Sequence, residues 1–321
     1  MQDDPNTSVM DAQTREWLAN LEETSESRGY FEPLGKRHYA VLTDAAPTLL
    51  VTFETIESIL EDSEDELPLG FDLVAANGWS HLGIIAHGNT WFRDQALYNY
   101  FDRLVDDGFF EDFDRVIFMG AGMCGYAAAA YSVVAPGCTV MVYNPLASLD
   151  PRVTEWDQRF TSMRRTSFTD RYGFAPDMIE AANQVFVFYD PEEEMDAMHA
   201  ALFTRPHVTK LRCRYLGRHI MQDMIHMDIL QPLLETAGTG DDIAKRFHSL
   251  FRARHAYSPY LRRLLMRLDD DDRCLLSGLL CRNVVNRMKA PRFRRRLIAI
   301  ETKMAAAGLS LPEMRKSQPA E

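Results

Sequence analysis

The residues that could most readily take part in a chemical reaction lie in one short segment and at two later positions. The segment Arg115–Tyr126 reads RVIFMGAGMCGY, an apolar run that passes through glycines to the thiol of Cys124. Asp190 and His219 follow later in the chain. A thiol in the first turn of a helix lies at the positive end of the helix dipole, which favours the thiolate. With a histidine as base and an aspartate to orient it, such a thiolate could attack an ester or a thioester.

The glycine-rich part of this segment resembles the nucleophile elbow of the α/β-hydrolase superfamily. In that elbow, G-x-S-x-G places the nucleophilic serine on a tight turn between a strand and a helix. A common variant reads G-x-S-M-G-G-Y. The present stretch reads Gly120-Ala121-Gly122-Met123-Cys124-Gly125-Tyr126. In this register Gly122 stands at the position of the serine, and Cys124 stands at the position of a glycine.

The later residues follow the order of the same family. Asp190 comes directly after the apolar run Val185–Tyr189, at the position of the triad acid, and His219 is in the place of the triad histidine. The run Leu49–Phe53 resembles the strand whose following loop supplies an oxyanion-hole amide. Glu54 at that place would oppose a developing negative charge.

The resemblance covers about residues 37–235 and implies a hydrolase fold with a degenerate elbow. Glycine has no side chain that can attack, so we predict a pseudoenzyme: a non-catalytic or weakened protein that binds a small-molecule ligand or a partner protein. His87 follows the apolar run Leu82–Ala86, and the carboxyl ends of parallel strands are where ligands bind in such sheets. The predicted ligand-binding residues are Gly122, Met123, Phe53, Glu54 and His87.

A catalytic role for Cys124 is the first alternative. Together, Cys124, Asp190 and His219 would form a catalytic set for an ester or thioester hydrolase or an acyltransferase. The register centred on Cys124 weighs against this alternative, because the bulky Tyr126 then stands where the elbow needs a small residue.

Nucleotide binding at the glycines is a second alternative. The pattern Gly120-x-Gly122-x-x-Gly125 fits the spacing of a phosphate-binding loop between a strand and a helix. Such a loop normally opens the first βαβ unit, and an acidic residue follows the second strand. Here the next apolar run, Thr139–Tyr143, ends in Asn144 and Pro145 instead.

These residues must be positioned by apolar runs that alternate with helical patterns. Most of the runs are apolar on both faces, which is typical of parallel strands covered by helices. The alternation predicts an α/β fold, a mostly parallel doubly wound sheet of α/β-hydrolase type followed by a helical C-terminal region. The predicted strands are Tyr39–Leu42, Leu49–Phe53, Leu82–Ala86, Arg115–Met119, Thr139–Tyr143, Val185–Tyr189 and Lys210–Leu216. The predicted helices between them are Thr55–Glu61, Asp94–Leu104, Gly125–Val134 and Glu192–Phe203.

Charge and composition divide the chain into three regions. Residues 1–36 form a polar lead-in with one predicted helix, Asp11–Glu23, in which Asp11 could be the N-cap. Residues 37–235 form the α/β domain, with an aromatic insertion at about 150–182 that could cap a pocket. Residues 236–321 form a basic helical region. The net charge is −12 overall, −21 over residues 1–240 and +9 over residues 241–321.

Composition also excludes several classes of protein. With 46% apolar and 26% charged residues, the chain is neither disordered nor fibrous. Its longest apolar stretch, Tyr126–Pro136, is too short to cross a bilayer. The acidic N-terminus does not fit a secretory signal, and five scattered cysteines without a CxxC pair indicate free thiols. We therefore predict a cytoplasmic protein without a membrane span, a metal or a cofactor.

The C-terminal arginines do not change this interpretation. Arg292 and Arg294–Arg296 form a basic cluster, but no zinc, RRM or helix-turn-helix signature accompanies it. We predict that the cluster is solvated or contacts the acidic region, and that nucleic acid is not a partner.

Overall fold

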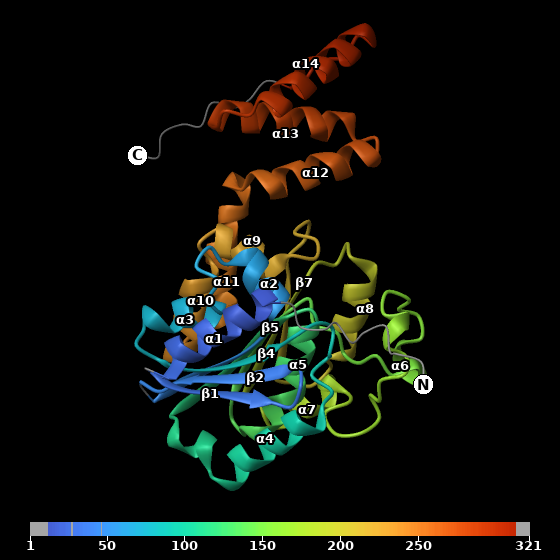
Figure 1. The fold of residues 1–321 in the computed structure, drawn as a ribbon. Coiled ribbons are helices and arrows are strands. Elements are labelled where there is room, and N and C mark those ends of the chain that lie inside the picture. The colour runs from blue at the N-terminus through green and yellow to red at the C-terminus, as the bar shows by residue number, and fades with distance from the viewer. Residues whose placement is uncertain (1–11, 27, 46, 313–321) are drawn as a thin grey trace. The chain divides into compact units, whose positions relative to one another are not determined.

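The predicted strands lie together in one eight-stranded sheet in the computed structural model of the chain, which describes residues 12–26, 28–45 and 47–312 (Figure 1). The strand order is β1-β2-β4-β3-β5-β6-β7-β8. The pairs β1–β2 and β2–β4 are antiparallel, and all the other pairs are parallel. The strands are β1 (Gly29–Leu34), β2 (His38–Thr43), β3 (Thr48–Thr55), β4 (Ser80–Ala86), β5 (Arg115–Ala121), β6 (Thr139–Tyr143), β7 (Gln184–Tyr189) and β8 (Val208–Arg212).

Helices cover both faces of this sheet, which explains why its central strands are apolar on both sides (Figure 1). On one face α4 (Gln95–Asp106) and α5 (Met123–Tyr131) pack against side chains such as Phe53, whose ring stacks on Phe101 and Tyr131. On the other face lie α1 (Ala12–Glu26), α2 (Ile56–Asp62) and α3 (Leu69–Ala75). The prediction of a mostly parallel sheet with helices on both faces is confirmed.

The aromatic insertion is part of the core rather than a separate cap. It contains α6 (Pro151–Thr154), α7 (Ala175–Met178) and two short 3-10 turns, Thr161–Met163 and Ile179–Ala181. The ring of Phe168 packs edge-on against both Trp91 and Tyr126, and the ring of Tyr172 stacks on Tyr131 at 4.3 Å. The insertion thus covers the outer side of α5.

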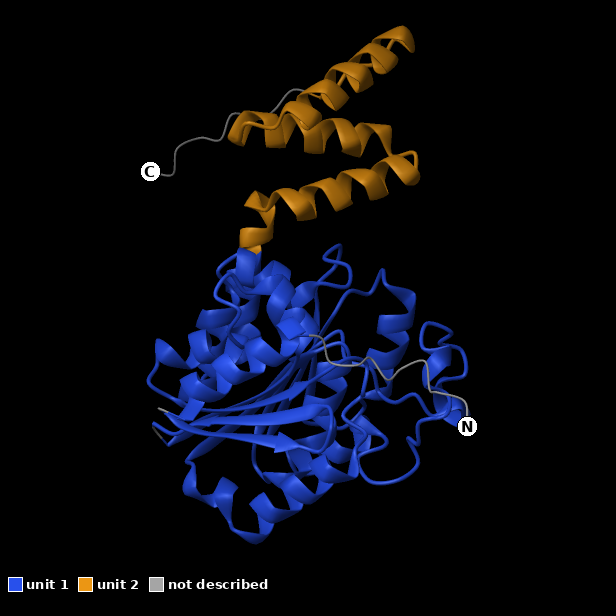
Figure 2. Cartoon of the chain, in the orientation of Figure 1, with its two compact units in different colours: residues 1–251 blue, residues 252–321 orange. Residues whose placement is uncertain are grey.

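The chain divides into two compact units, residues 1–251 and 252–321 (Figure 2). The first unit also holds four helices after β7: α8 (Glu194–Leu202), α9 (Ile220–His226), α10 (Leu230–Thr239) and α11 (Ile243–Leu250). Phe247 on α11 is fully buried and packs against Phe188 of β7. The α/β unit therefore extends to Phe251, beyond the boundary at residue 235 that we expected from composition.

The second unit is helical, as predicted. After a 3-10 turn, Phe251–Ala256, it consists of α12 (Ser258–Asp270), α13 (Cys274–Arg287) and α14 (Pro291–Ala306). Gly278 lets α13 and α14 approach closely, since a Cβ there would lie 3.1 Å from a side-chain carbon of Ile300. Within the described residues, no helix combines the length and the apolar composition needed to cross a bilayer.

Local departures from the expected elements have local causes. β1 lies in the predicted polar lead-in, and the sequence did not predict it because Glu32 and Pro33 interrupt its apolar pattern. Proline is tolerated at this position because β1 is an edge strand. α5 begins at Met123 rather than Gly125, and β8 ends at Arg212 rather than Leu216. α1 ends at Glu26, and the expected N-cap Asp11 lies outside the described residues.

Candidate functional site

The turn between β5 and α5 has the backbone geometry of a nucleophile elbow. Gly122 has φ 57° and ψ −120°, a conformation that L-amino-acid side chains rarely adopt. Its N–H donates to the carbonyl of Tyr143 at 2.8 Å, and its carbonyl accepts from the N–H of Tyr126 at 3.0 Å. A Cβ built at Gly122 would meet no atom within 4 Å. The position that a side chain at Gly122 would occupy is therefore open space.

The other two glycines of the motif have a packing role. A Cβ at Gly120 would lie 2.4 Å from the carbonyl oxygen of Cys124, and one at Gly125 would lie 3.1 Å from the carbonyl oxygen of Gly120. These contacts are with backbone atoms, which cannot rotate away. The close approach of β5 and α5 is thus sufficient to explain the glycine spacing of the segment, which resembles that of a nucleotide-binding loop.

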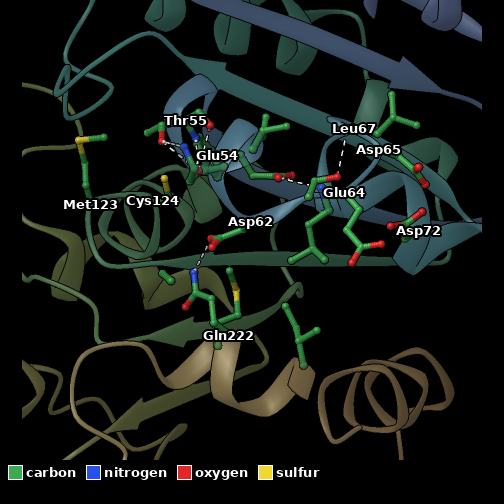
Figure 3. Close-up of a pocket in the computed structure, with 18 of the residues that line it drawn as sticks. Glu54, Thr55, Asp62, Glu64, Asp65, Leu67, Asp72, Met123, Cys124 and Gln222 are labelled. Carbon is green, nitrogen blue, oxygen red and sulfur yellow. Dashed lines mark hydrogen bonds between the residues drawn. The ribbon is translucent and has the colours of Figure 1, made fainter. Parts of the chain in front are cut away.

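A pocket of about 570 Å³ opens beside the elbow, and we call it the elbow pocket (Figure 3). It includes Ala121 and Met123, on either side of Gly122. Gln222 on α9 donates to Asp62 on α2 at 3.1 Å, which links the two helices beside the pocket. The lining residues are Phe53, Glu54, Thr55, Ser58, Ile59, Asp62, Ser63, Glu64, Asp65, Leu67, Leu69, Asp72, Asn89, Ala121, Met123, Cys124, Met221, Gln222 and Ile225.

Four of the residues predicted from the sequence meet in this pocket: Phe53, Glu54, Met123 and Cys124. Met123 is fixed by its sulfur, which accepts a hydrogen bond from the N–H of Trp91 at 3.2 Å. The lining found among the described residues contains none from the aromatic insertion at 150–182, nor His87, Asp190 or His219. The pocket thus combines residues from the end of β3 with residues from the elbow, whereas the side chains of His87, Asp190 and His219 are not part of its lining.

Glu54 is the buried carboxylate of the elbow pocket. Its Oε1 accepts from the Thr52 hydroxyl at 2.9 Å and its Oε2 accepts from the N–H of Leu69 at 2.8 Å. Burial raises the pKa of Glu54, and these hydrogen bonds, with one from the N–H of Gly70, act in the opposite direction. The Thr52 hydroxyl donates to Glu54, so it accepts from Nε2 of His81, 2.8 Å away.

Cys124 lines the pocket, but its environment stabilises the thiol. Burial raises the pKa of Cys124 well above its usual range, and the nearby carboxylates of Glu54 and Glu57 raise it further. The helix dipole, which favours the thiolate, acts in the opposite direction. All five cysteines are free.

Asp190 lies at the end of β7, where the family resemblance puts the triad acid, but it is bonded to the backbone. Its carboxylate accepts from the N–H of Glu192 at 3.0 Å and from the N–H of Gly217 at 2.7 Å, and a further bond comes from the N–H of Tyr215. Burial raises the pKa of Asp190, and the three amides partly offset that rise.

The two predicted histidines have other surroundings in the structure. His219 is exposed and occupies the N-cap position of α9. His87 follows β4 and is half-buried, with its Nε2 3.8 Å from Oε1 of Glu57 on α2. The hydrogen bonds that the structure gives to the Asp190 carboxylate come from main-chain N–H groups, not from the imidazole of His219.

A second polar cluster, which the sequence reasoning missed, ties the insertion to the sheet. Arg159 donates to Asp196 at 2.6 Å and to Asp157 at 2.7 Å. Asn144, at the end of β6, donates to Asp196 at 3.0 Å, and Nε2 of His199 lies 3.0 Å from Asp157. The members come from three distant segments, so spacing in the sequence gave no signal for them.

Strand order and elbow together decide the kind of fold. The central strand β5 runs directly into the strained turn at Gly122, and the turn leads into a buried helix. The fold is of the α/β-hydrolase type. The resemblance predicted from the sequence is confirmed at this level, while the role of the missing serine stays a prediction.

Comparisons with known proteins find similarity among solved structures. No protein-family model matches the sequence, and no curated protein matches it. Among solved structures, Est1E from Butyrivibrio proteoclasticus is 11% identical, with a TM-score of 0.43 over 65% of this chain and 98% of its own. A capsule O-acetyltransferase of Neisseria meningitidis serogroup A is 9% identical, with a TM-score of 0.42 over 63% and 94%. The Pyrococcus furiosus esterase Pf2001 is 13% identical, with a TM-score of 0.42 over 62% and 86%. These similarities concern the fold, and the chemistry of this chain is judged from its own residues.

Proposed function

We propose that the protein is a ligand-binding member of the hydrolase folds without acyl-transfer chemistry, and that the elbow pocket holds its ligand. The observation that carries the proposal is the turn at Gly122. Its backbone has the strained conformation of an elbow, yet the space where a nucleophile would stand is open. Covalent catalysis needs an attacking atom at this point.

The region that would form an oxyanion hole also supports a non-catalytic role. In hydrolases one donor comes from the loop after the third strand. Here β3 passes directly into α2, and the N–H of Thr55 donates to the hydroxyl of Ser58 at 3.2 Å. The adjacent Glu54 carboxylate would repel a developing oxyanion. An anionic tetrahedral intermediate would therefore be poorly stabilised.

The pocket itself suits a small molecule. A volume of about 570 Å³ falls in the range of ligand pockets, and its lining mixes apolar side chains with a few polar groups. The pocket's position at the carboxyl ends of β3 and β5 is where ligands bind in open α/β sheets.

An ester or thioester hydrolase, or an acyltransferase, that uses Cys124 is the second candidate. The observation in its favour is that Cys124 lines the pocket. The raised pKa of its thiol and the exposed position of His219 argue against it. This candidate requires that Cys124→Ala abolish hydrolysis of an activated ester.

Native mass spectrometry of the full chain tests the main proposal. We expect the gently purified protein to carry a non-covalent small molecule that organic solvent releases. Ile225→Trp should block the pocket and lower occupancy, because Ile225 is 37% exposed and lines the pocket. Met198→Trp is the matched control, since Met198 is 36% exposed on α8 and does not line it. Equal occupancy in both variants would contradict the proposal.

A further inference from the structure

The charged side chains of the elbow pocket all have one sign. Its lining contains five carboxylates, and the lining residues of the described chain include no lysine, arginine or histidine. These carboxylates belong to Glu54, Asp62, Glu64, Asp65 and Asp72. An anionic ligand would meet uncompensated repulsion at this site.

The carboxylates are arranged by depth. Asp62, Glu64, Asp65 and Asp72 are exposed, so they form a rim that attracts cations from solution. Glu54, labelled in Figure 3, is 9% exposed and is the one buried carboxylate among the lining residues of the described chain. A ligand that passes the rim therefore reaches one buried acceptor rather than several.

Apolar side chains surround this buried acceptor. Phe53 and Ile59 are almost fully buried, and Met123 and Met221 are half-buried. The thioethers of the two methionines can adapt to the shape of an apolar group. The walls thus suit a hydrocarbon body, and the carboxylate suits a polar head.

The Glu54 side chain is held in a fixed orientation and keeps accepting capacity. It accepts three hydrogen bonds, from the Thr52 hydroxyl and the amides of Leu69 and Gly70, whereas a carboxylate can accept about four. The Thr52 hydroxyl is itself fixed by His81. A preorganised carboxylate binds an added donor without losing further side-chain freedom.

We infer that the elbow pocket binds a primary amine with an apolar body, whose ammonium group donates to the Glu54 carboxylate while its hydrocarbon part contacts Phe53 and Met123. This inference rests on the proposed function, and it names the ligand class. A charge-assisted hydrogen bond in a partly dry site is stronger than a neutral one. An organic cation fits better than a bare metal ion, because no three acidic, His or Cys side chains within the described residues are grouped to hold a metal.

Calorimetry on the full chain with three probes of equal length tests the ligand class. The probes are hexylamine, hexanol and hexanoate at neutral pH and low salt. We expect hexylamine to bind about tenfold or more tightly than hexanol, and hexanoate not to bind. Glu54→Gln should reduce hexylamine affinity by about tenfold or more and leave hexanol unchanged. Glu22→Gln, an exposed position on α1, is the control and should change neither affinity.

Each outcome separates the ligand class from the proposed function. Equal affinity for hexanol and hexylamine overturns the amine inference but leaves a binding pocket. Absence of binding by all three probes overturns the amine inference, while the native mass spectrometry of the purified protein decides the proposed function separately. If Glu54→Gln does not fold, as judged by circular dichroism, Ile225→Trp replaces it and should abolish hexylamine binding. Unchanged hexylamine affinity in a folded Glu54→Gln protein, or hexylamine binding by a folded Ile225→Trp protein, overturns the assigned site.

Discussion

The carboxylate of Asp190 accepts a hydrogen bond from the backbone N–H of Gly217, with 2.7 Å between Oδ2 and the nitrogen. A second bond, from the N–H of Glu192 at 3.0 Å, engages the other carboxylate oxygen. Asp190 therefore ties the turn after β7 to the segment between β8 and α9. In a hydrolase triad the same oxygen would orient a histidine ring.

Asp190→Ala is expected to lower the free energy of unfolding of the protein. The substitution leaves the partly buried N–H groups of Glu192 and Gly217 without their acceptor, which costs about 1–3 kcal/mol of unfolding free energy. His219→Ala should change stability by less than about 0.5 kcal/mol, because His219 is exposed. Urea denaturation of both variants measures the difference. Equal loss of an ester hydrolysis activity in both variants, with stability unchanged, would show that they form a catalytic pair.

Gly122→Ser is expected to fold with reduced stability and to gain no measurable ester hydrolysis. Gly122 has φ 57° and ψ −120°, and a side chain in such a strained conformation costs about 1–3 kcal/mol. The new hydroxyl would have space around it, but the Asp190 carboxylate that should orient a histidine base is engaged by backbone amides. Thermal denaturation and the release of p-nitrophenol from p-nitrophenyl butyrate test the two parts.

Ala121→Ser is the matched control for that experiment, because it adds the same hydroxyl one residue earlier at an ordinary backbone position. We expect it to change stability by less than about 0.5 kcal/mol. Burst release of p-nitrophenol by Gly122→Ser alone would mean that a base does reach the elbow, and the non-catalytic interpretation would then be wrong.

Cys124 is expected to react slowly with iodoacetamide in the folded protein. Burial and two neighbouring carboxylates raise the pKa of its thiol, so little thiolate is present at pH 8. The thiolate is the reacting form, so the alkylation rate falls with the thiolate fraction. Cys274, which is half-buried, serves as the internal reference. Peptide mapping after timed alkylation should find Cys274 modified first, and faster labelling of Cys124 would support a catalytic thiol.

The strands were predictable because a strand that is buried on both faces is a continuous run of apolar residues in the sequence. Thr139–Tyr143 was predicted to the residue, and the central strands Leu49–Phe53 and Leu82–Ala86 lie within β3 and β4. The elbow was also predictable, since a strand, small residues and a helix must follow one another directly. The edge strand β1 was not, because it is only half-buried and contains Pro33.

The pocket was predictable only on the side that the elbow and β3 form. Phe53, Glu54, Met123 and Cys124 were candidates because they are close to a recognisable turn. The opposing wall comes from α9, where Gln222 meets Asp62 across 160 residues of sequence. Such a contact depends on how two helices dock, and neither helix carries a local signal of it. Asp190 was placed at the right strand end, but its hydrogen bonds depend on the fold of a later loop.

Acidification from pH 7 to about 5.5 is expected to destabilise the folded protein through its buried histidines. Burial lowers the pKa of His81 to about 3 and that of His38 to about 4. Burial also lowers the pKa of His199, whose Nδ1 accepts from the N–H of Ala147 so that its proton sits on Nε2. Histidines of the unfolded chain take up protons near pH 6.5, whereas these folded histidines do not. Acidification from pH 7 to about 5.5 therefore lowers the free energy of unfolding by about 1 kcal/mol per buried histidine.

Urea denaturation at both pH values, repeated on single substitutions, tests this dependence. The raised pKa values of the buried acids Glu54 and Asp190 act in the opposite direction, because these carboxyl groups take up protons at a higher pH in the folded protein than in the unfolded chain, where the range is about 4 to 4.5. The wild type and the histidine variants share this contribution, so it cancels when their pH-dependent losses are compared. His81→Gln should reduce the pH-dependent loss by about 1 kcal/mol, since it removes one site that resists protonation. His226→Gln is the matched control, because His226 is exposed on α9, and the loss should persist in it. An equal pH-dependent loss in the wild type and in His81→Gln would contradict the burial of a neutral His81.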